Sequence, residues 1–171
     1  MSRLSTLSPA ALRAMFSPDA DDTLITLLTL TGAGIATPIR LADGYTQRIS
    51  ETADEVAYGV VSRAQSFIFL PLQITLPTEE QASAPRASIT LHDVTRYLMP
   101  HIRQLTGAPS VLIELVLAST PDVVEASFPG FLMGAVSYTA DTITAELTVE
   151  GLGSEPFPQH AFTPANFPGL F

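Results

Sequence analysis

Acid–base chemistry at neutral pH would most readily come from histidine, and the chain has three histidines, His92, His101 and His160. They stand far apart in unlike sequence contexts, and none belongs to the H-E-x-x-H pattern of a zinc-dependent hydrolase. His92 lies beside Asp93 at an expected strand-to-helix junction, where a surface or helix-capping role explains it better than a general base. No serine lies in a G-x-S-x-G motif, and without cysteine the chain has no thiolate nucleophile and no cysteine-based zinc site.

Two other groups of residues could carry chemistry. Gly32 and Gly34 follow an apolar run, but neither a third glycine nor a helix follows them, so we interpret this segment as a turn rather than a phosphate-binding loop. Glu79 and Glu80 could form the carboxylate pair of a hydrolase, but solvated loop charge better explains two glutamates in a polar segment. The sequence therefore predicts no catalytic residue, no metal ligand and no cofactor, and an uncharacterised hydrolase stays an alternative.

Charged residues in apolar or helical surroundings are the more informative candidates. Glu114 interrupts the apolar run 111–118, and because a buried lone charge is costly unless it is paired, we expect an arginine beside it. A contact to another subunit and a catalytic role are the alternatives for Glu114. Arg96 and Arg103 lie seven residues apart in a segment with helical spacing, so they share nearly one face and are either solvated or part of an intersubunit salt bridge.

Most of the chain has the short apolar runs and turn residues typical of β-strands. A short N-terminal helix is expected at 10–16, capped by Ser8, and a second, amphipathic helix at 93–105, kinked at Pro100. The expected strands are residues 23–31, 35–41, 46–50, 56–61, 66–75, 87–91, 111–118, 131–138 and 142–150. This pattern predicts a mainly β fold, a sandwich or barrel, with one inserted helix.

Turn and breaker residues place the expected strands relative to one another. Pro38 marks its strand as an edge or a bulge, and Pro71 excludes a simple central strand for residues 66–75. The dipeptide Asp43-Gly44 is typical of a hairpin turn. A second hairpin is expected around Ala140-Asp141, and the run 111–118 should lie in the middle of a sheet that is covered on both faces.

Length and charge narrow the function classes. The 171 residues suit one domain, and 46% of them are hydrophobic while only 15% are charged. The net charge is −9, there is no lysine, and the eight arginines are scattered, so duplex nucleic acid and anionic membrane surfaces are poor partners. The first 16 residues lack the apolar run of a secretory signal, and no run approaches the roughly 20 apolar residues of a membrane span.

The last residues differ from the rest of the chain. Residues 154–171 show neither helical nor strand periodicity, and they alternate prolines with phenylalanines. Prolines favour an extended backbone, so ordering such an arm against a surface costs less entropy than ordering a flexible tail. We therefore divide the chain into an N-terminal helix or arm at 1–21, a β-rich domain at 22–153 and a C-terminal arm at 154–171. The arm's phenylalanines are expected to cover the chain's own core or to fill pockets on a partner.

Five segments carry a resemblance to a known family. ITLHDVTRYLMPHIRQL, PSVLIELVLASTPDVVEA and the closing EPFPQHAFTPANFPGLF resemble a family of phage minor tail proteins that is classed as a domain of unknown function. TLLTLTGAGIATPIRLADG and FIFLPLQITLPTEEQASAPRASITLHDV are similar to the same family. The resemblance runs from about Asp22 to Phe171, is most specific at FPGLF, and is weakest at 50–66.

The resemblance implies a structural virion protein of the tail tip or baseplate, synthesised in the host cytoplasm, with a fold related to that of tail-tube domains. It implies a ring of three or six copies that joins the tail tube to the hub near the tape-measure protein, and it implies no enzymatic activity. The resemblance implies assembly contacts in the C-terminal arm, at Phe157, Phe162, Phe167, Pro168, Gly169, Leu170 and Phe171. Arg96 and Arg103 are added as expected contacts on the ground of their spacing. The other alternative is a small-ligand-binding β-barrel whose pocket would be lined by Phe67, Phe69 and Tyr97.

Overall fold

The computed structural model describes residues 7–17, 19–52, 56–75, 86–92, 98, 100, 104, 106–139 and 141–149, and this part of the chain is mainly β with one helix. The helix is α1 (Pro9–Phe16). The strands are β1 (Leu24–Thr31), β2 (Ile39–Ala42), β3 (Gln47–Glu51), β4 (Val56–Ser62), β5 (Gln65–Phe69), β6 (Leu72–Thr75), β7 (Arg86–His92), β8 (Ser110–Leu117), β9 (Val124–Tyr138) and β10 (Thr142–Val149). The mainly β prediction is confirmed.

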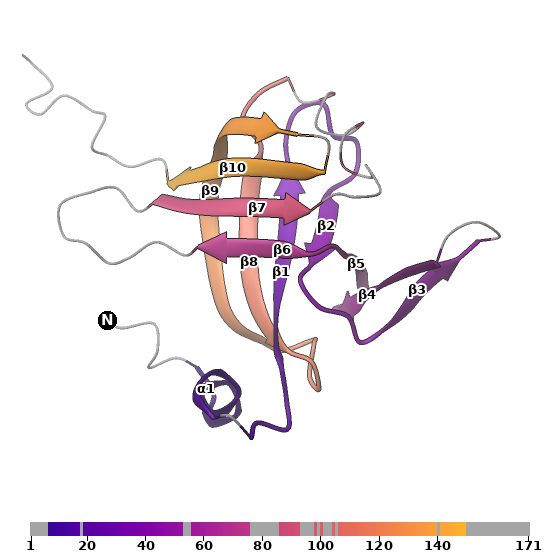
Figure 1. Cartoon of the computed structure of the whole chain (residues 1–171), viewed down its shortest axis with the longest axis vertical. Coiled ribbons are helices and arrows are strands. Elements are labelled where there is room, and N and C mark those ends of the chain that lie inside the picture. Colours follow the sequence, from indigo (N-terminus) through magenta and orange to yellow (C-terminus); the bar gives the residue numbers. More distant parts are fainter. Residues whose placement is uncertain are drawn as a thin grey trace, which may run out of the picture.

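All ten strands belong to one sheet, in the order β3-β4-β5-β2-β1-β8-β9-β10-β7-β6. Neighbouring strands pair antiparallel except β2 and β5, which run parallel. The sheet is strongly curved, so that β6, β7 and β10 cross in front of β1, β8 and β9 (Figure 1). The arrangement is therefore barrel-like, and the β3–β4 hairpin projects from one side of it.

The barrel closes through the short link between β5 and β6. Leu70 donates its backbone N–H to Ala42 of β2 (3.0 Å), and the carbonyl of Pro71 accepts from the N–H of His92 on β7 (2.9 Å). Proline has no N–H to donate, so the strand must break where its neighbour changes from β2 to β7. The prediction that Pro71 interrupts the run 66–75 is confirmed, and the break is the point where β5, beside β2, is joined to β6 at the other end of the curved sheet.

β9 is long because irregularities bend it around the barrel. Its pairing with β8 shifts between Val111 and Ile113 and again between Leu115 and Val116, and its pairing with β10 shifts between Ala145 and Leu147. In each case β9 contributes the extra residue, which is the definition of a β-bulge and increases the local bend. Gly130 lies in one of these bulges with φ +83°, a conformation that glycine adopts without steric cost.

Side chains from both faces of β1 and β8 are buried. Leu28 and Ile113 belong to the larger core cluster, which also takes side chains from β2, β7, β9 and β10. Leu27 and Val116 belong to a second cluster with Val60 of β4 and with β5. Because successive side chains of a strand point to opposite faces, β1 and β8 are covered on both sides. This confirms the expectation that the run 111–118 is a central, doubly covered strand.

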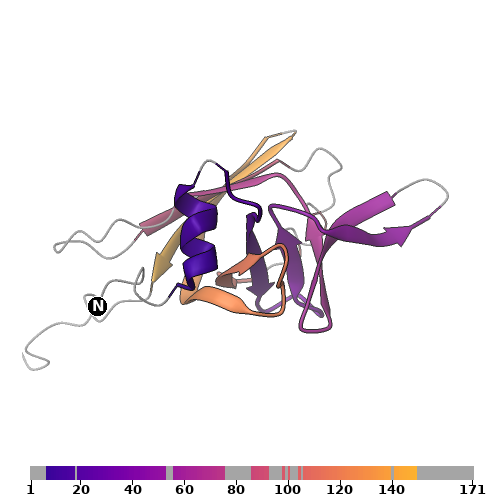
Figure 2. The same ribbon diagram turned by 90° about the horizontal axis from the view of Figure 1, so that it is seen from below.

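The N-terminal helix begins and ends as its sequence predicts. The Ser8 hydroxyl caps α1 by accepting from the Ala11 N–H (3.1 Å), and Pro9 occupies the first turn. Glu125 of β9 holds the cap in place, because its carboxylate accepts from both the N–H and the hydroxyl of Ser8 at 2.9 Å. Ala11 is fully buried, so α1 lies against the outside of the barrel, as Figure 2 shows.

Asp22 fastens the segment after α1 to the end of β8. Its carboxylate accepts from the N–H groups of Thr23 (2.9 Å) and Ser119 (3.2 Å) and from the Ser119 hydroxyl. The hydroxyl hydrogen bond, which outweighs a small opposing effect of burial, lowers the pKa of Asp22. A carboxylate with a lowered folded-state pKa stabilises the fold above its unfolded pKa, and this stability is lost as the pH falls through the folded value.

We therefore expect Asp22→Asn and Ser119→Ala to lose less stability than the wild type between about pH 5 and pH 3. The difference should be under about 1 kcal/mol, because the carboxylate is solvent-screened. Urea unfolding at each pH measures it. If both variants lose as much stability as the wild type over this pH range, the contact between Asp22 and Ser119 does not contribute to the acid sensitivity of the fold.

One expected hairpin turn and the expected position of one strand are wrong, and a second expected hairpin is confirmed. Pro38 marks neither an edge nor a bulge: it precedes β2, which lies between β1 and β5 and pairs with β1 without a register shift. Asp43-Gly44 does not close a hairpin, since β2 and β3 are not paired; instead the Asp43 carboxylate accepts from the Thr26 N–H (2.7 Å) and fixes the end of β1. The hairpin around Ala140-Asp141 is confirmed by the pairing of β9 with β10.

The remaining predictions lie outside the described residues. Of the helix expected at 93–105, the structure describes only residues 98, 100 and 104. Leu98 is buried in the larger core cluster. The division at 22–153 and the arm at 154–171 stay predictions.

Candidate assembly surface

The residues expected to make assembly contacts lie outside the described part of the chain. These are Arg96, Arg103, Phe157, Phe162, Phe167, Pro168, Gly169, Leu170 and Phe171. These contacts therefore stay predictions, and the surfaces that the structure describes supply the candidates below.

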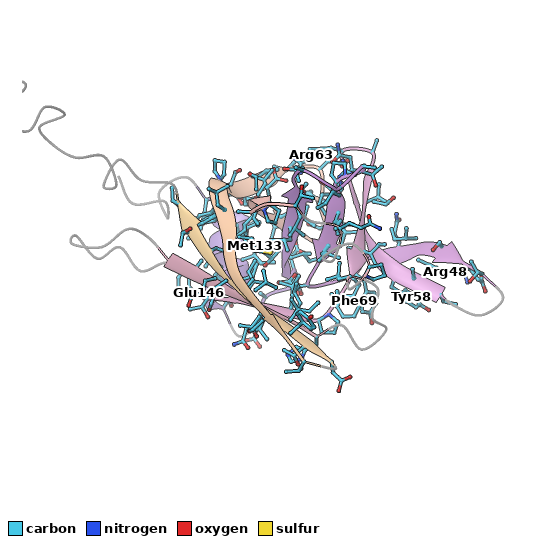
Figure 3. All side chains as sticks on the ribbon, turned by 90° about the horizontal axis from the view of Figure 1, so that it is seen from above. Arg48, Tyr58, Arg63, Phe69, Met133 and Glu146 are labelled. Atoms are coloured by element: carbon cyan, nitrogen blue, oxygen red, sulfur yellow. The ribbon has the colours of Figure 1, made fainter. Side chains whose placement is uncertain are left out.

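Three aromatic side chains meet at the base of the projecting β3–β4 hairpin. The ring centroids of Tyr45 and Tyr58 are 5.5 Å apart with a tilt of 53°, and those of Tyr45 and Phe69 are 5.3 Å apart, edge to face. These separations and tilts are the favoured geometries of aromatic pairs. Figure 3 shows Tyr58 and Phe69 close together, where the hairpin leaves the barrel. We call Tyr45, Tyr58 and Phe69 the aromatic cluster.

Backbone pairing fixes the three rings. Tyr58 lies on β4 opposite Arg48 of β3, and Phe69 ends β5 opposite Ala42 of β2. Tyr45 lies in the link between β2 and β3, and the next residue, Thr46, donates its N–H to the Gly59 carbonyl (2.9 Å). Backbone hydrogen bonds therefore position the cluster from β4, from β5 and from the link between β2 and β3.

The two tyrosines of the cluster are exposed to solvent, and Phe69 is half-buried. Tyr45 is 60% exposed and Tyr58 47%, and Val56, two residues before Tyr58 on the same face of β4, is 42% exposed. Tyrosine offers a broad apolar ring and a hydroxyl with little side-chain entropy to lose, which is why it is frequent in binding surfaces. An arrangement of this kind can hold an apolar segment and donate hydrogen bonds to its carbonyl groups.

The outer edge of the hairpin is charged. β3 ends the sheet order, and its Arg48 and Glu51 form an exposed ion pair of 2.7 Å. Charged side chains on an edge strand discourage uncontrolled pairing with another strand. The chemistry of the hairpin therefore favours recognition by the side chains of the aromatic cluster over addition of a further strand.

Glu114 is paired with an arginine, as its apolar surroundings predict. Its side chain is only 9% exposed, and the two guanidinium nitrogens of Arg63 donate to its two carboxylate oxygens at 2.9 Å and 2.6 Å. This forked geometry is the strongest form of the arginine–carboxylate contact. The hydrogen bond to Glu114 raises the pKa of Arg63 above its usual value, with a smaller opposing effect of burial.

A tight turn presents Arg63 to Glu114. Arg63 and Ala64 connect β4 to β5 with φ of 50° and 61°, the left-handed conformation at both positions that a type I′ hairpin turn requires. Asparagine and glycine adopt this conformation more readily, so the turn is strained by roughly 1–2 kcal/mol per residue. The Asp122 carboxylate accepts from the Arg63 N–H, and the ion pair fixes the side chain, so both contacts offset the strain.

Other candidate residues have structural roles. Gly34 has φ +94° in the turn after β1, which confirms a turn at Gly32–Gly34. His92 is exposed at the end of β7, where it pairs with Thr142 of β10 and donates its backbone N–H to the Pro71 carbonyl. Phe67 is fully buried in the second core cluster, so it fills the core rather than lining an open ligand pocket. Tyr97, Glu79, Glu80, His101 and His160 lie outside the described residues.

A shallow pocket of about 330 Å³ lies between α1 and the segment that follows it. Arg13, Asp19, Asp21 and Asp22 line it together with small residues. Among the described residues, no group of three or more histidines, aspartates or glutamates is placed to hold a metal ion. None of the described helical segments has the length and apolar character needed to cross a membrane.

The exposed tyrosines were missed in the sequence. Val56, Tyr58 and Val60 occupy every second position and therefore share one face of their strand. The sequence alone allows that face to point into the core, because tyrosine is common both in cores and at surfaces. The available signal was the charged strand 47–51 beside it, since a polar partner strand indicates an outer position in the sheet.

Comparison with protein-family models finds no match, and comparison with curated proteins finds none either.

Proposed function

We propose that the protein is a structural subunit of the tail tip or baseplate of a tailed phage, where copies form a closed ring of three or six that joins the tail tube to the hub. The observation that carries an assembly role is the aromatic cluster, with its two exposed tyrosines, at the base of the projecting hairpin. Exposed aromatic surface of this kind is typical of sites that bind another chain. The phage setting rests on the sequence resemblance of the segments between Asp22 and Phe171.

A ring needs a surface on one side of the subunit that fits a different surface on the other side. The hairpin leaves the barrel on one side, and β10 ends at Val149 on the opposite side, just before the proline-rich residues (Figure 1). These two features are thus placed at opposite sides of one copy, as head-to-tail contacts around an axis require. The barrel-like fold supports the same proposal, because it gives these contacts a stiff frame.

Oligomeric state tests the proposal. Light scattering on the purified full-length chain, across a hundredfold range of concentration, should detect a species of three or six times 18.2 kDa. Tyr45→Ser/Tyr58→Ser should shift this equilibrium toward the monomer, whereas Tyr138→Ser, which replaces an exposed tyrosine at the end of β9, should leave it unchanged. A chain that stays monomeric at the highest concentration would contradict self-assembly.

A further inference from the structure

We propose that the aromatic cluster is the receptor for the C-terminal segment 154–171 of a neighbouring copy. The inference rests on the proposed ring and adds to it the pair of surfaces that meet between adjacent subunits. It concerns Tyr45, Tyr58 and Phe69 on one copy and the proline- and phenylalanine-rich segment of the next.

The chemistry of the two partners matches. Proline-rich segments are recognised by surfaces lined with aromatic rings, because a proline ring packs flat on a tyrosine and the extended backbone leaves its carbonyl groups free to accept hydrogen bonds. The cluster offers the Tyr45 ring with two further rings at 5.3 Å and 5.5 Å from it, and the hydroxyls of two tyrosines. The segment supplies the prolines at 156, 158, 164 and 168 and the phenylalanines at 157, 162, 167 and 171.

Strand addition at the hairpin edge fits the same segment less well. Each proline lacks the N–H group that a paired strand must donate, so four prolines would interrupt the ladder repeatedly. The exposed ion pair of Arg48 and Glu51 also occupies that edge. Contact through side chains on the cluster therefore accounts for both partners better than backbone pairing does.

The placement of the two features favours a neighbouring copy over the same copy. The described chain ends at Val149, on the side of the barrel opposite the hairpin (Figure 1). Residues 150–171 can span on the order of 70 Å when extended at about 3.1 Å per residue, whereas a domain of this size is roughly 40 Å across. The segment is thus long enough to leave its own barrel and reach the next hairpin. To reach the aromatic cluster of its own copy, the segment would have to run back around the barrel.

Cysteine cross-linking of full-length chains tests the inference, because the chain has no cysteine of its own. One chain carries Val56→Cys, which lies beside the cluster and leaves its three rings intact; the other carries Ala161→Cys or Ala165→Cys, between the phenylalanines of the segment. Oxidation of the mixture should give a disulfide-linked heterodimer, identified by its mass. Val123→Cys is the matched control, an exposed valine in the β8–β9 turn, and it should give at least tenfold less heterodimer.

A chain with Val56→Cys and Ala165→Cys together separates a neighbour from the same copy. Docking between copies predicts a ladder of covalent multimers whose longest member equals the ring. A cross-linked monomer without a ladder would overturn the inference in favour of docking within one chain. Adding Tyr45→Ser/Tyr58→Ser to the Val56→Cys chain should abolish the heterodimer.

The failures of the two proposals are distinguishable. If light scattering shows the ring and neither segment cysteine reacts with Val56→Cys above the level of Val123→Cys, the receptor assignment is wrong while the ring proposal stands. If no oligomer forms at any concentration, the ring proposal itself is contradicted.

Discussion

Gly59→Ala is expected to be among the most damaging single substitutions in the described part of the barrel. A Cβ at this position would lie 1.9 Å from the carbonyl oxygen of Phe67, a backbone atom of the paired strand, and 3.1 Å from Cγ1 of Ile49. Neither β5 nor the core residue Phe67 can move away without disturbing the pairing of β4 with β5. The expected loss is at least about 3 kcal/mol of unfolding free energy, measured by urea denaturation.

Gly107→Ala is the control for Gly59→Ala. A Cβ at Gly107 would have no atom within 4 Å, so the substitution should leave the urea midpoint unchanged or raise it slightly. The same Gly59→Ala variant should also weaken assembly, since β4 carries Tyr58 and the Gly59 carbonyl, which accepts from the N–H of Thr46 next to Tyr45. A Gly59→Ala protein as stable as Gly107→Ala would contradict the close approach of β4 and β5.

Arg63→Met is expected to cost about 3 kcal/mol, because it leaves the carboxylate of Glu114 buried without its partner. The second substitution Glu114→Gln should restore part of that loss, since it removes the uncompensated charge. A double-mutant cycle on thermal or urea unfolding then gives the coupling between the two residues. If the stability losses of Arg63→Met and Glu114→Gln simply add in the double variant, the ion pair does not fix the β4–β5 turn.

Arg48→Met is the matched control for Arg63→Met. Arg48 also forms an ion pair, with Glu51 at 2.7 Å, but the side chains of both residues are more than half exposed. Exposed pairs contribute about 1 kcal/mol or less. Equal effects of the two substitutions would mean that burial of Glu114 does not determine the strength of its pairing.

Elements with local signals were predictable from the sequence. The N-terminal helix has a serine cap and a proline in its first turn, and both function as expected at Ser8 and Pro9. The run 111–118 is apolar on both faces, which only a doubly covered strand explains, and β8 is such a strand. The β9–β10 hairpin follows from alternation on either side of a short polar turn.

Elements that depend on distant partners were not predictable. Nothing in the local sequence indicates that β2 pairs in parallel with β5, or that Asp43 accepts from Thr26 rather than closing a hairpin. The first half of β9 was missed because Pro129 and Gly130 resemble a turn, whereas they lie in a bulge of one continuous strand. Tertiary pairing decides each of these cases, and it overrides the local preference.

The candidate site was predictable only in part. The need for a partner at Glu114 follows from the cost of burying a charge, but eight arginines were equally available, and Arg63 is 51 residues away in sequence. The aromatic cluster joins three segments that meet only after the barrel forms. The arm at 154–171 was singled out by composition, and its role remains a proposal.

Immunogold electron microscopy of phage particles that encode the chain, with an antibody against residues of the barrel, tests the proposed tail-tip function most directly. The proposal predicts gold particles at the free end of the tail in intact virions, with three or six copies per virion by quantitative mass spectrometry. Infectious virions that lack the chain, or that carry it away from the tail tip, would contradict the proposal.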